Sequence, residues 1–183
     1  MDGERYEEMA LNILSGKGFY LTISDDPMMS YTDKPTILRA PLYPYFIFLI
    51  YELLGKKVWV IQLIQVLLSS TTCFIIYSIA KAIYGEKIGN LSAFIFAFFP
   101  FFIWYVPRFY QETVFTFLLA VFTYCMLKLL KDLRLRTALL TGIILGVTNL
   151  CRSTMLIFPV FLLFFLYLLK KIKKKRLFNV FWF

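Results

Sequence analysis

The sequence contains no histidine among its 183 residues. This absence excludes Ser-His-Asp and Cys-His catalytic groups, histidine-ligated zinc and a histidine general base. Any acid–base chemistry must therefore use carboxylates, lysine, tyrosine or cysteine. The three cysteines, Cys73, Cys125 and Cys151, are odd in number and lie in apolar stretches. We interpret them as small apolar side chains and not as a disulfide framework or a metal site.

Charged residues are also scarce. They make up 17% of the chain, whereas 60% of its residues are hydrophobic and 20% are aromatic. Soluble domains are about 45–50% apolar, so the composition indicates an integral membrane protein. The net charge of +9 comes from 20 basic and 11 acidic residues. Because the basic residues lie between apolar runs, we attribute them to membrane topology and not to a nucleic-acid partner.

Long apolar runs predict the fold class. They cover residues 58–80, 88–107, 109–127 (interrupted by Glu112) and 133–172, the last with Arg152 near its middle. About 20 helical residues cross the hydrocarbon core, so 133–172 is long enough for two spans that turn near Arg152. We expect an all-α, multi-pass transmembrane helical bundle. Its predicted parts are an outer loop with juxtamembrane helices over 1–57, about five helices over 58–176, and the start of a further segment over 177–183.

The amino-terminal region differs from these runs. Residues 5–15 predict an amphipathic helix that Gly16 and Gly18 stop, and residues 19–39 predict a loop. Residues 40–55 form an apolar run of only 16 residues, with prolines that suit a first helical turn. We interpret this run as a juxtamembrane or re-entrant helix, while a short spanning helix stays open as the alternative.

The distribution of Lys and Arg predicts the orientation. The segments 81–87, 128–136 and 170–176 hold two, four and six of them. The positive-inside rule therefore places these segments in the cytoplasm, which puts Arg108, Glu112 and Arg152 on the outer side. If the helix at 40–55 lies in the outer interface, residues 1–39 are outside as well.

Several charged residues could carry chemistry. A carboxylate of Asp2 or Glu4 could accept a proton, although a solvated acidic helix face is the alternative. Three arginines could bind an anionic headgroup or a phosphate, although snorkelling or a structural anchor explains each one alone; these are Arg39, Arg108 and Arg152. Glu112 lies about one turn into its expected helix and could face a polar cavity or pair with Arg108 on the same helical face.

These candidates occur within an ordered set of motifs. In sequence they read Asp-x-x-x-Tyr-x-x-x-Ala, Gly-x-Gly-Phe, Arg-x-Pro-Leu-Tyr-Pro, Pro-x-x-x-x-Tyr, Gln-Glu-Thr, Gly-x-x-x-Gly and Asn-Leu-x-Arg-Ser. They fall on Asp2, Tyr6, Ala10, Gly16, Gly18, Phe19, Arg39, Pro41, Leu42, Tyr43, Pro44, Pro100, Tyr105, Gln111, Glu112, Gly142, Gly146 and Arg152, with Gln65 on the apolar helix between. The set resembles the amino-terminal half of GT-C superfamily glycosyltransferases, in the group of protein O-mannosyltransferases and the lipid A aminoarabinose transferase.

The resemblance implies a function and roles for residues. Such enzymes move a sugar from a polyprenyl-phosphate donor to an acceptor hydroxyl on a lipid, glycan or protein, at the extracytoplasmic face of the cell membrane. The loop carboxylate that acts in catalysis falls on Asp2, helped or replaced by Glu4, and a substrate-binding glutamate falls on Glu112. Arg152, Arg39 and Arg108 are expected to bind the lipid phosphate. A divalent metal held by carboxylates stays open as a cofactor, without a histidine or a tight Asp-x-Asp pattern to support it.

The helix that precedes the catalytic loop in this superfamily is missing before Asp2, and later helices are missing after residue 176, so we expect the chain to be a fragment. The alternative function is a non-enzymatic multi-pass membrane protein, either a transporter segment or a lipid-binding assembly subunit. That alternative predicts charges at mid-depth of the membrane, whereas here they gather near the ends of the runs.

Overall fold

A computed structural model describes residues 2–19, 39–132, 134–152, 156–158 and 160–161, and of Asp2 it describes the backbone alone. Residues 20–38 of the expected loop over 19–39, most of the final span and the segment 177–183 lie outside these residues. The chain divides into two units, Met1–Arg152 and Ser153–Phe183, and every helix named below belongs to the first. The described residues form helices and no strand, which confirms the all-α class.

Within the part of the chain that the structure describes, two helices are long and apolar enough to cross a membrane. They are α3 (Val58–Tyr84) and α6 (Glu112–Lys131), which extend for about 40 Å and 30 Å at ~1.5 Å per residue. Only 22% of the most apolar window of each helix is buried within the protein. The other apolar side chains are partly buried or exposed, and the exposed ones, such as Leu63, Leu67 and Phe74, are available to face lipid. The expected total of five spans stays a prediction.

The prediction of a single helix over 88–107 is wrong. The structure has α4 (Glu86–Phe98) and α5 (Pro100–Tyr105), separated at Phe99, whose backbone is extended. Proline has no N–H and disfavours helical geometry in the residue before it, so Pro100 ends one helix and begins the next. None of the α5 side chains is buried.

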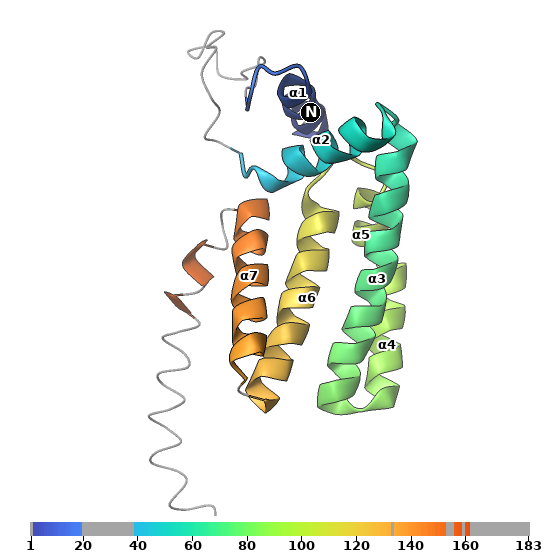
Figure 1. The fold of residues 1–183 in the computed structure, drawn as a ribbon. Helices are drawn as coiled ribbons and strands as arrows, with labels where there is room; N and C mark the ends of the chain where they lie inside the picture. The colour runs from blue at the N-terminus through green and yellow to red at the C-terminus, as the bar shows by residue number, and fades with distance from the viewer. Residues whose placement is uncertain (1, 20–38, 133, 153–155, 159, 162–183) are drawn as a thin grey trace, which may run out of the picture. The chain divides into compact units, whose positions relative to one another are not determined.

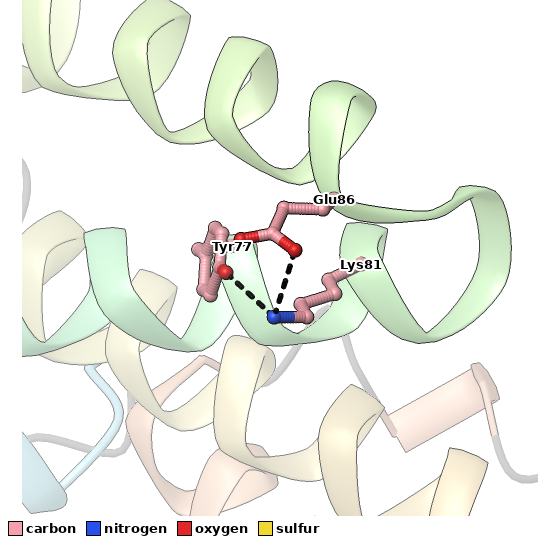
Figure 2. A network of polar contacts seen from close by, with 3 residues as sticks. All are labelled: Tyr77, Lys81 and Glu86. Carbon is pink, nitrogen blue, oxygen red and sulfur yellow. Dashed lines mark hydrogen bonds and ion pairs between the residues drawn. The ribbon is translucent and has the colours of Figure 1, made fainter.

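The turn between α3 and α4 lies at the basic end of the bundle. The Nζ of Lys81 is 3.0 Å from the hydroxyl of Tyr77, to which it donates, and 3.5 Å from the carboxylate of Glu86 (Figure 2). Gly85 closes this turn with a φ of +90°, a conformation that favours glycine. The turn from α6 to α7 (Leu135–Cys151) lies at the same end of the unit (Figure 1). The basic segments 81–87 and 128–136 therefore share one end, as their charge predicts.

The opposite end carries the amino-terminal helices. Helix α1 (Asp2–Leu14) packs on α2 (Leu42–Leu54), and α2 contacts both α3 and α7 across their ends (Figure 1). The hydroxyl of Tyr51 donates a hydrogen bond of 2.7 Å to the carboxylate of Glu7, which joins the two helices. Their shared core includes Tyr6, Tyr43 and Cys151. The acidic helix and Arg152 thus lie at the same end of the bundle.

Candidate functional site

A polar cavity of about 370 Å³ lies at this end of the bundle. Its walls come from segments that are distant in the sequence: α1, the short segment before α2, α5, the loop after α5, the start of α6 and the residue that follows α7. The lining residues are Tyr6, Arg39, Trp104, Tyr105, Tyr110, Gln111, Glu112 and Arg152. Cationic, anionic, amide and aromatic groups therefore meet in one space.

Two guanidinium groups supply the positive charge of the cavity. Arg39 lies over the ring of Tyr6 at 5.5 Å, and Arg152 lies over the ring of Phe115 at 5.5 Å. Arg152 is half-buried, and its backbone is extended where α7 ends. Its side chain therefore does not follow the helical spacing of α7. Guanidinium groups stay charged and present a planar set of donors that matches phosphate oxygens.

Two acceptor oxygens of the cavity are buried without a hydrogen-bond partner. They are Oε2 of Glu112 and Oε1 of Gln111, and neither has a partner among the described residues. Gln111 precedes the first residue of α6, yet its side chain does not cap the helix. A buried acceptor without a donor is costly, at about 1–3 kcal/mol. These two oxygens are therefore suited to accept hydrogen bonds from a hydroxyl-bearing ligand.

The core beneath the cavity contains Tyr43, which is fully buried. Its ring packs edge-on against Tyr6 at 5.1 Å, and its hydroxyl accepts a hydrogen bond of 3.3 Å from the Nε2 of Gln65. Burial raises the pKa of the Tyr43 hydroxyl, and the nearby Glu112 carboxylate raises it further. Tyr43 therefore stays neutral.

The structure gathers three of the residues that the sequence suggested. Arg39, Glu112 and Arg152 all line the polar cavity. The expected pairing of Arg108 with Glu112 on one helical face is wrong, because α6 begins at Glu112 and Arg108 lies in the preceding loop. The Arg108 guanidinium instead stacks on the ring of Trp104 at 3.7 Å, outside the cavity lining.

The two acidic candidates lie on the first turn of α1. The Glu4 side chain is exposed and is not part of the cavity lining. Gly3 stands between them and packs on the loop after α5, since a Cβ added there would come within 3.2 Å of the Phe109 carbonyl oxygen. The backbone of this turn therefore abuts the loop that leads to Glu112. The catalytic role of Asp2 stays a prediction.

Five residues of the lining were not assigned a role from the sequence: the aromatic residues Tyr6, Trp104, Tyr105 and Tyr110, and the amide residue Gln111. Tyr6, Tyr105 and Gln111 belonged to the motifs, while Trp104 and Tyr110 belonged to none. The signal that could have identified them is the dense run of aromatic side chains over 101–110, next to charged residues.

A divalent cation also stays a prediction: across the described ranges no three His, Cys, Asp or Glu side chains gather as a set that could hold a metal ion.

An apolar groove continues from the polar cavity. A second cavity of about 270 Å³ shares Tyr105, Glu112 and Arg152 with the polar one. It also shares four residues with a third, mainly apolar cavity of about 530 Å³ between α3, α4 and α5. The four are Ser69, Phe96, Phe102 and Val106. We call these three adjoining cavities the trough: its charged head is the polar cavity, and its apolar extension is the cavity between α3, α4 and α5.

A charged cavity adjoins an apolar cavity between α3, α4 and α5, an arrangement that suits a ligand with a polar head and an apolar tail. Residues 33–182 match the model of the dolichyl-phosphate-mannose-protein mannosyltransferase family, so the chain belongs to this family of membrane glycosyltransferases. No curated protein and no solved structure gave a match. The family, and not a single relative, therefore supports the functional argument.

Proposed function

We propose that this protein transfers a sugar from a polyprenyl-phosphate donor to an acceptor hydroxyl of a lipid, glycan or protein at the extracytoplasmic face of the membrane. The observation that carries this proposal is the trough with its charged head and apolar extension. A polyprenyl-phosphate sugar has the same division, because a phosphate and a sugar stand at one end of a long apolar chain.

The phosphate of the donor lies between Arg39 and Arg152 in this proposal. Both side chains line the polar cavity, and they come from different elements, so they can approach an anion from two sides. Charge-assisted hydrogen bonds of this kind are about twice as strong as neutral ones. They also stabilise the negative charge that the phosphate gains as it leaves. The isoprenoid chain then extends along the apolar groove past Phe102 and Val106.

The sugar ring lies beside Gln111 and Glu112. Their two unpaired oxygens accept hydrogen bonds from sugar hydroxyls, which removes the cost of burying acceptors alone. The rings of Trp104, Tyr105 and Tyr110 give the apolar face of the sugar a surface to pack on.

The reaction is a single displacement with inversion. The acceptor oxygen attacks the anomeric carbon and forms the new glycosidic bond, while the bond from that carbon to the phosphate oxygen breaks. The phosphate leaves with the bonding electron pair as polyprenyl phosphate. The proton of the acceptor hydroxyl passes to the carboxylate of Asp2, helped or replaced by Glu4.

A transfer assay tests this proposal. Membranes that contain the full protein are incubated with a polyprenyl-phosphate donor whose sugar is labelled, and label on non-lipid or new lipid products is measured. We expect transfer by the wild-type protein, its loss in Asp2→Asn, and normal transfer in Arg136→Ala, which changes the opposite end of α7. Normal transfer by Asp2→Asn would reject the base assignment, and movement of a solute without glycosyl transfer would support the transporter alternative.

A further inference from the structure

The loop between α5 and α6, residues 106–111, brings Gln111 to the cavity and leads directly to Glu112. Short hydrogen bonds shape it: the N–H of Arg108 donates to the Tyr105 carbonyl at 3.1 Å, and the N–H of Tyr110 donates to the Arg108 carbonyl at 2.9 Å. These bonds close tight turns within the loop. They do not fix the loop relative to the bundle.

Two glutamines of α3 make that connection. The Nε2 of Gln62 donates to the Pro107 carbonyl at 2.9 Å, and the Nε2 of Gln65 donates to the Arg108 carbonyl at 3.2 Å. The two glutamines are three residues apart and so lie on one helical face, one turn from each other. They bind consecutive carbonyl groups of the loop. We infer that Gln62 and Gln65 are positioning residues that set where Gln111 and Glu112 stand in the cavity.

The burial of Gln65 supports this role. Its side chain has no exposed surface, and its amide hydrogens serve both the Arg108 carbonyl and the Tyr43 hydroxyl. Its Oε1 is buried and has no hydrogen-bond partner in the described part of the chain. An apolar residue would avoid that unpaired acceptor but would leave the Arg108 carbonyl without this donor. The hydrogen bond to the loop is therefore what a glutamine provides at this position and an apolar residue does not.

The loop is confined on its other side by α1. Gly3 approaches the Phe109 carbonyl so closely that an added Cβ would lie 3.2 Å from its oxygen, which makes even a methyl group a tight fit. The loop thus lies between α3 and the first turn of α1. Because Arg39 and Arg152 belong to other elements, we expect a shift of the loop to displace Gln111 and Glu112 more than the two arginines.

Hydrogen–deuterium exchange tests the connection without reference to activity. In the full protein, the double change Gln62→Ala and Gln65→Leu should raise exchange over residues 108–112 about fivefold or more, with little change in α7. Thr72→Val is the matched control, since Thr72 is equally buried on α3 but donates only to its own helix, to the Leu68 carbonyl at 2.7 Å. Unchanged exchange over the loop in the double variant would overturn the inference.

A kinetic measurement tests the consequence for catalysis, which rests on the proposed function. Gln65→Glu keeps the shape of the side chain, and at a pH above the pKa of the new carboxyl group, which burial raises, the ionised carboxylate does not donate to the Arg108 carbonyl. We expect kcat to fall about tenfold, equal to about 1.4 kcal/mol, while the KM for the donor stays within about twofold. Lowering the pH should restore part of kcat, because a protonated carboxyl donates one hydrogen.

The outcomes separate the two proposals. A raised donor KM with unchanged kcat, or an equal effect in Thr72→Val, would contradict the positioning role. If the wild-type protein transfers no sugar at all, the proposed function fails and the exchange experiment alone decides whether the glutamines hold the loop. If Gln65→Glu does not fold, the exchange of the double variant again gives the answer.

Discussion

Arg39 and Arg152 line the same cavity, although one precedes α2 and the other ends α7. Helix α2 lies across the bundle end where α7 finishes, which brings the two guanidinium groups to a single space. Glu112 enters the same space from the first residue of α6. Three separate elements thus form a site that no continuous stretch of the sequence contains.

Removing one of these arginines should weaken binding of the donor. Arg152→Ala removes a charge-assisted contact to the phosphate, so we expect the Kd for polyprenyl phosphate to rise about tenfold or more. Binding of the lipid to the purified protein measures this change directly. Arg136→Ala removes the same side chain at the other end of α7 and should leave the Kd unchanged. Unaltered affinity in Arg152→Ala would contradict the phosphate-binding role.

A bulky residue in the apolar groove should discriminate between long and short donors. Ala97 lines this groove, and Ala97→Trp should fill part of it. We expect the KM for a long-chain polyprenyl donor to rise about fivefold, because apolar contacts are lost. The KM for a short-chain analogue that does not reach the groove should be the same as in the wild-type protein. The control is Leu91→Trp on the exposed face of α4, which should affect neither substrate.

The contact between α1 and α2 should make stability depend on alkaline pH. Burial raises the pKa of the Tyr51 hydroxyl, and its hydrogen bond to Glu7 and the charge of that carboxylate add to the effect. A raised folded-state pKa gives a stabilisation that is complete below the unfolded value of about 10 and is lost as the pH rises above it. Tyr51→Phe should therefore be less stable than wild type at pH 7 by about 1 kcal/mol, and this difference should shrink above about pH 10.

The measurement for Tyr51 is thermal unfolding in detergent across this pH range. Tyr45→Phe is the matched control, because Tyr45 is an exposed tyrosine on the same helix. The control should behave as wild type at each pH. A stability difference for Tyr51→Phe that stays constant from neutral to strongly alkaline pH would show that the hydroxyl does not couple to folding in this way.

The tight contact at Gly3 should be sensitive to a single methyl group. In Gly3→Ala the new Cβ would lie 3.2 Å from the Phe109 carbonyl oxygen, closer than most real contacts. We expect about 1–3 kcal/mol of destabilisation and a lower transfer rate as α1 moves from the loop. Gly146→Ala adds the same methyl group where nothing lies within 4 Å, so its unfolding midpoint should not fall. Equal behaviour of the two variants would argue against close packing at Gly3.

Much of the fold could be predicted from the sequence because apolar runs and glycine stops act locally. The helices at 58–84 and 42–54 lie where the runs of apolar residues placed them. The break at Phe99 was missed, although Pro100 in the middle of a run was a visible signal. Helices that follow from the length and charge of an apolar run are therefore predictable. A break inside such a run depends on proline, which ends a helix without changing the apolar character of the run.

The site was predictable only in part. Arg39, Glu112 and Arg152 could be suspected because isolated charges beside apolar runs need a reason to be there. The contacts of Gln62 and Gln65 could not, since a glutamine in a helix does not indicate which distant carbonyl it reaches. The same limit explains the wrong pairing of Arg108 with Glu112, which assumed a helix that begins earlier than it does.

Photo-crosslinking of the donor tests the central claim most directly. A polyprenyl phosphate with a diazirine in the isoprene units nearest the phosphate is bound to the full protein, irradiated, and its attachment sites are identified by mass spectrometry. We predict attachment to the groove on α3 and α5, at residues such as Val66, Phe102 and Val106, and competition by unlabelled polyprenyl phosphate. Attachment confined to outward-facing residues such as Leu139 and Ile143 of α7, with no competition, would contradict the proposed donor site.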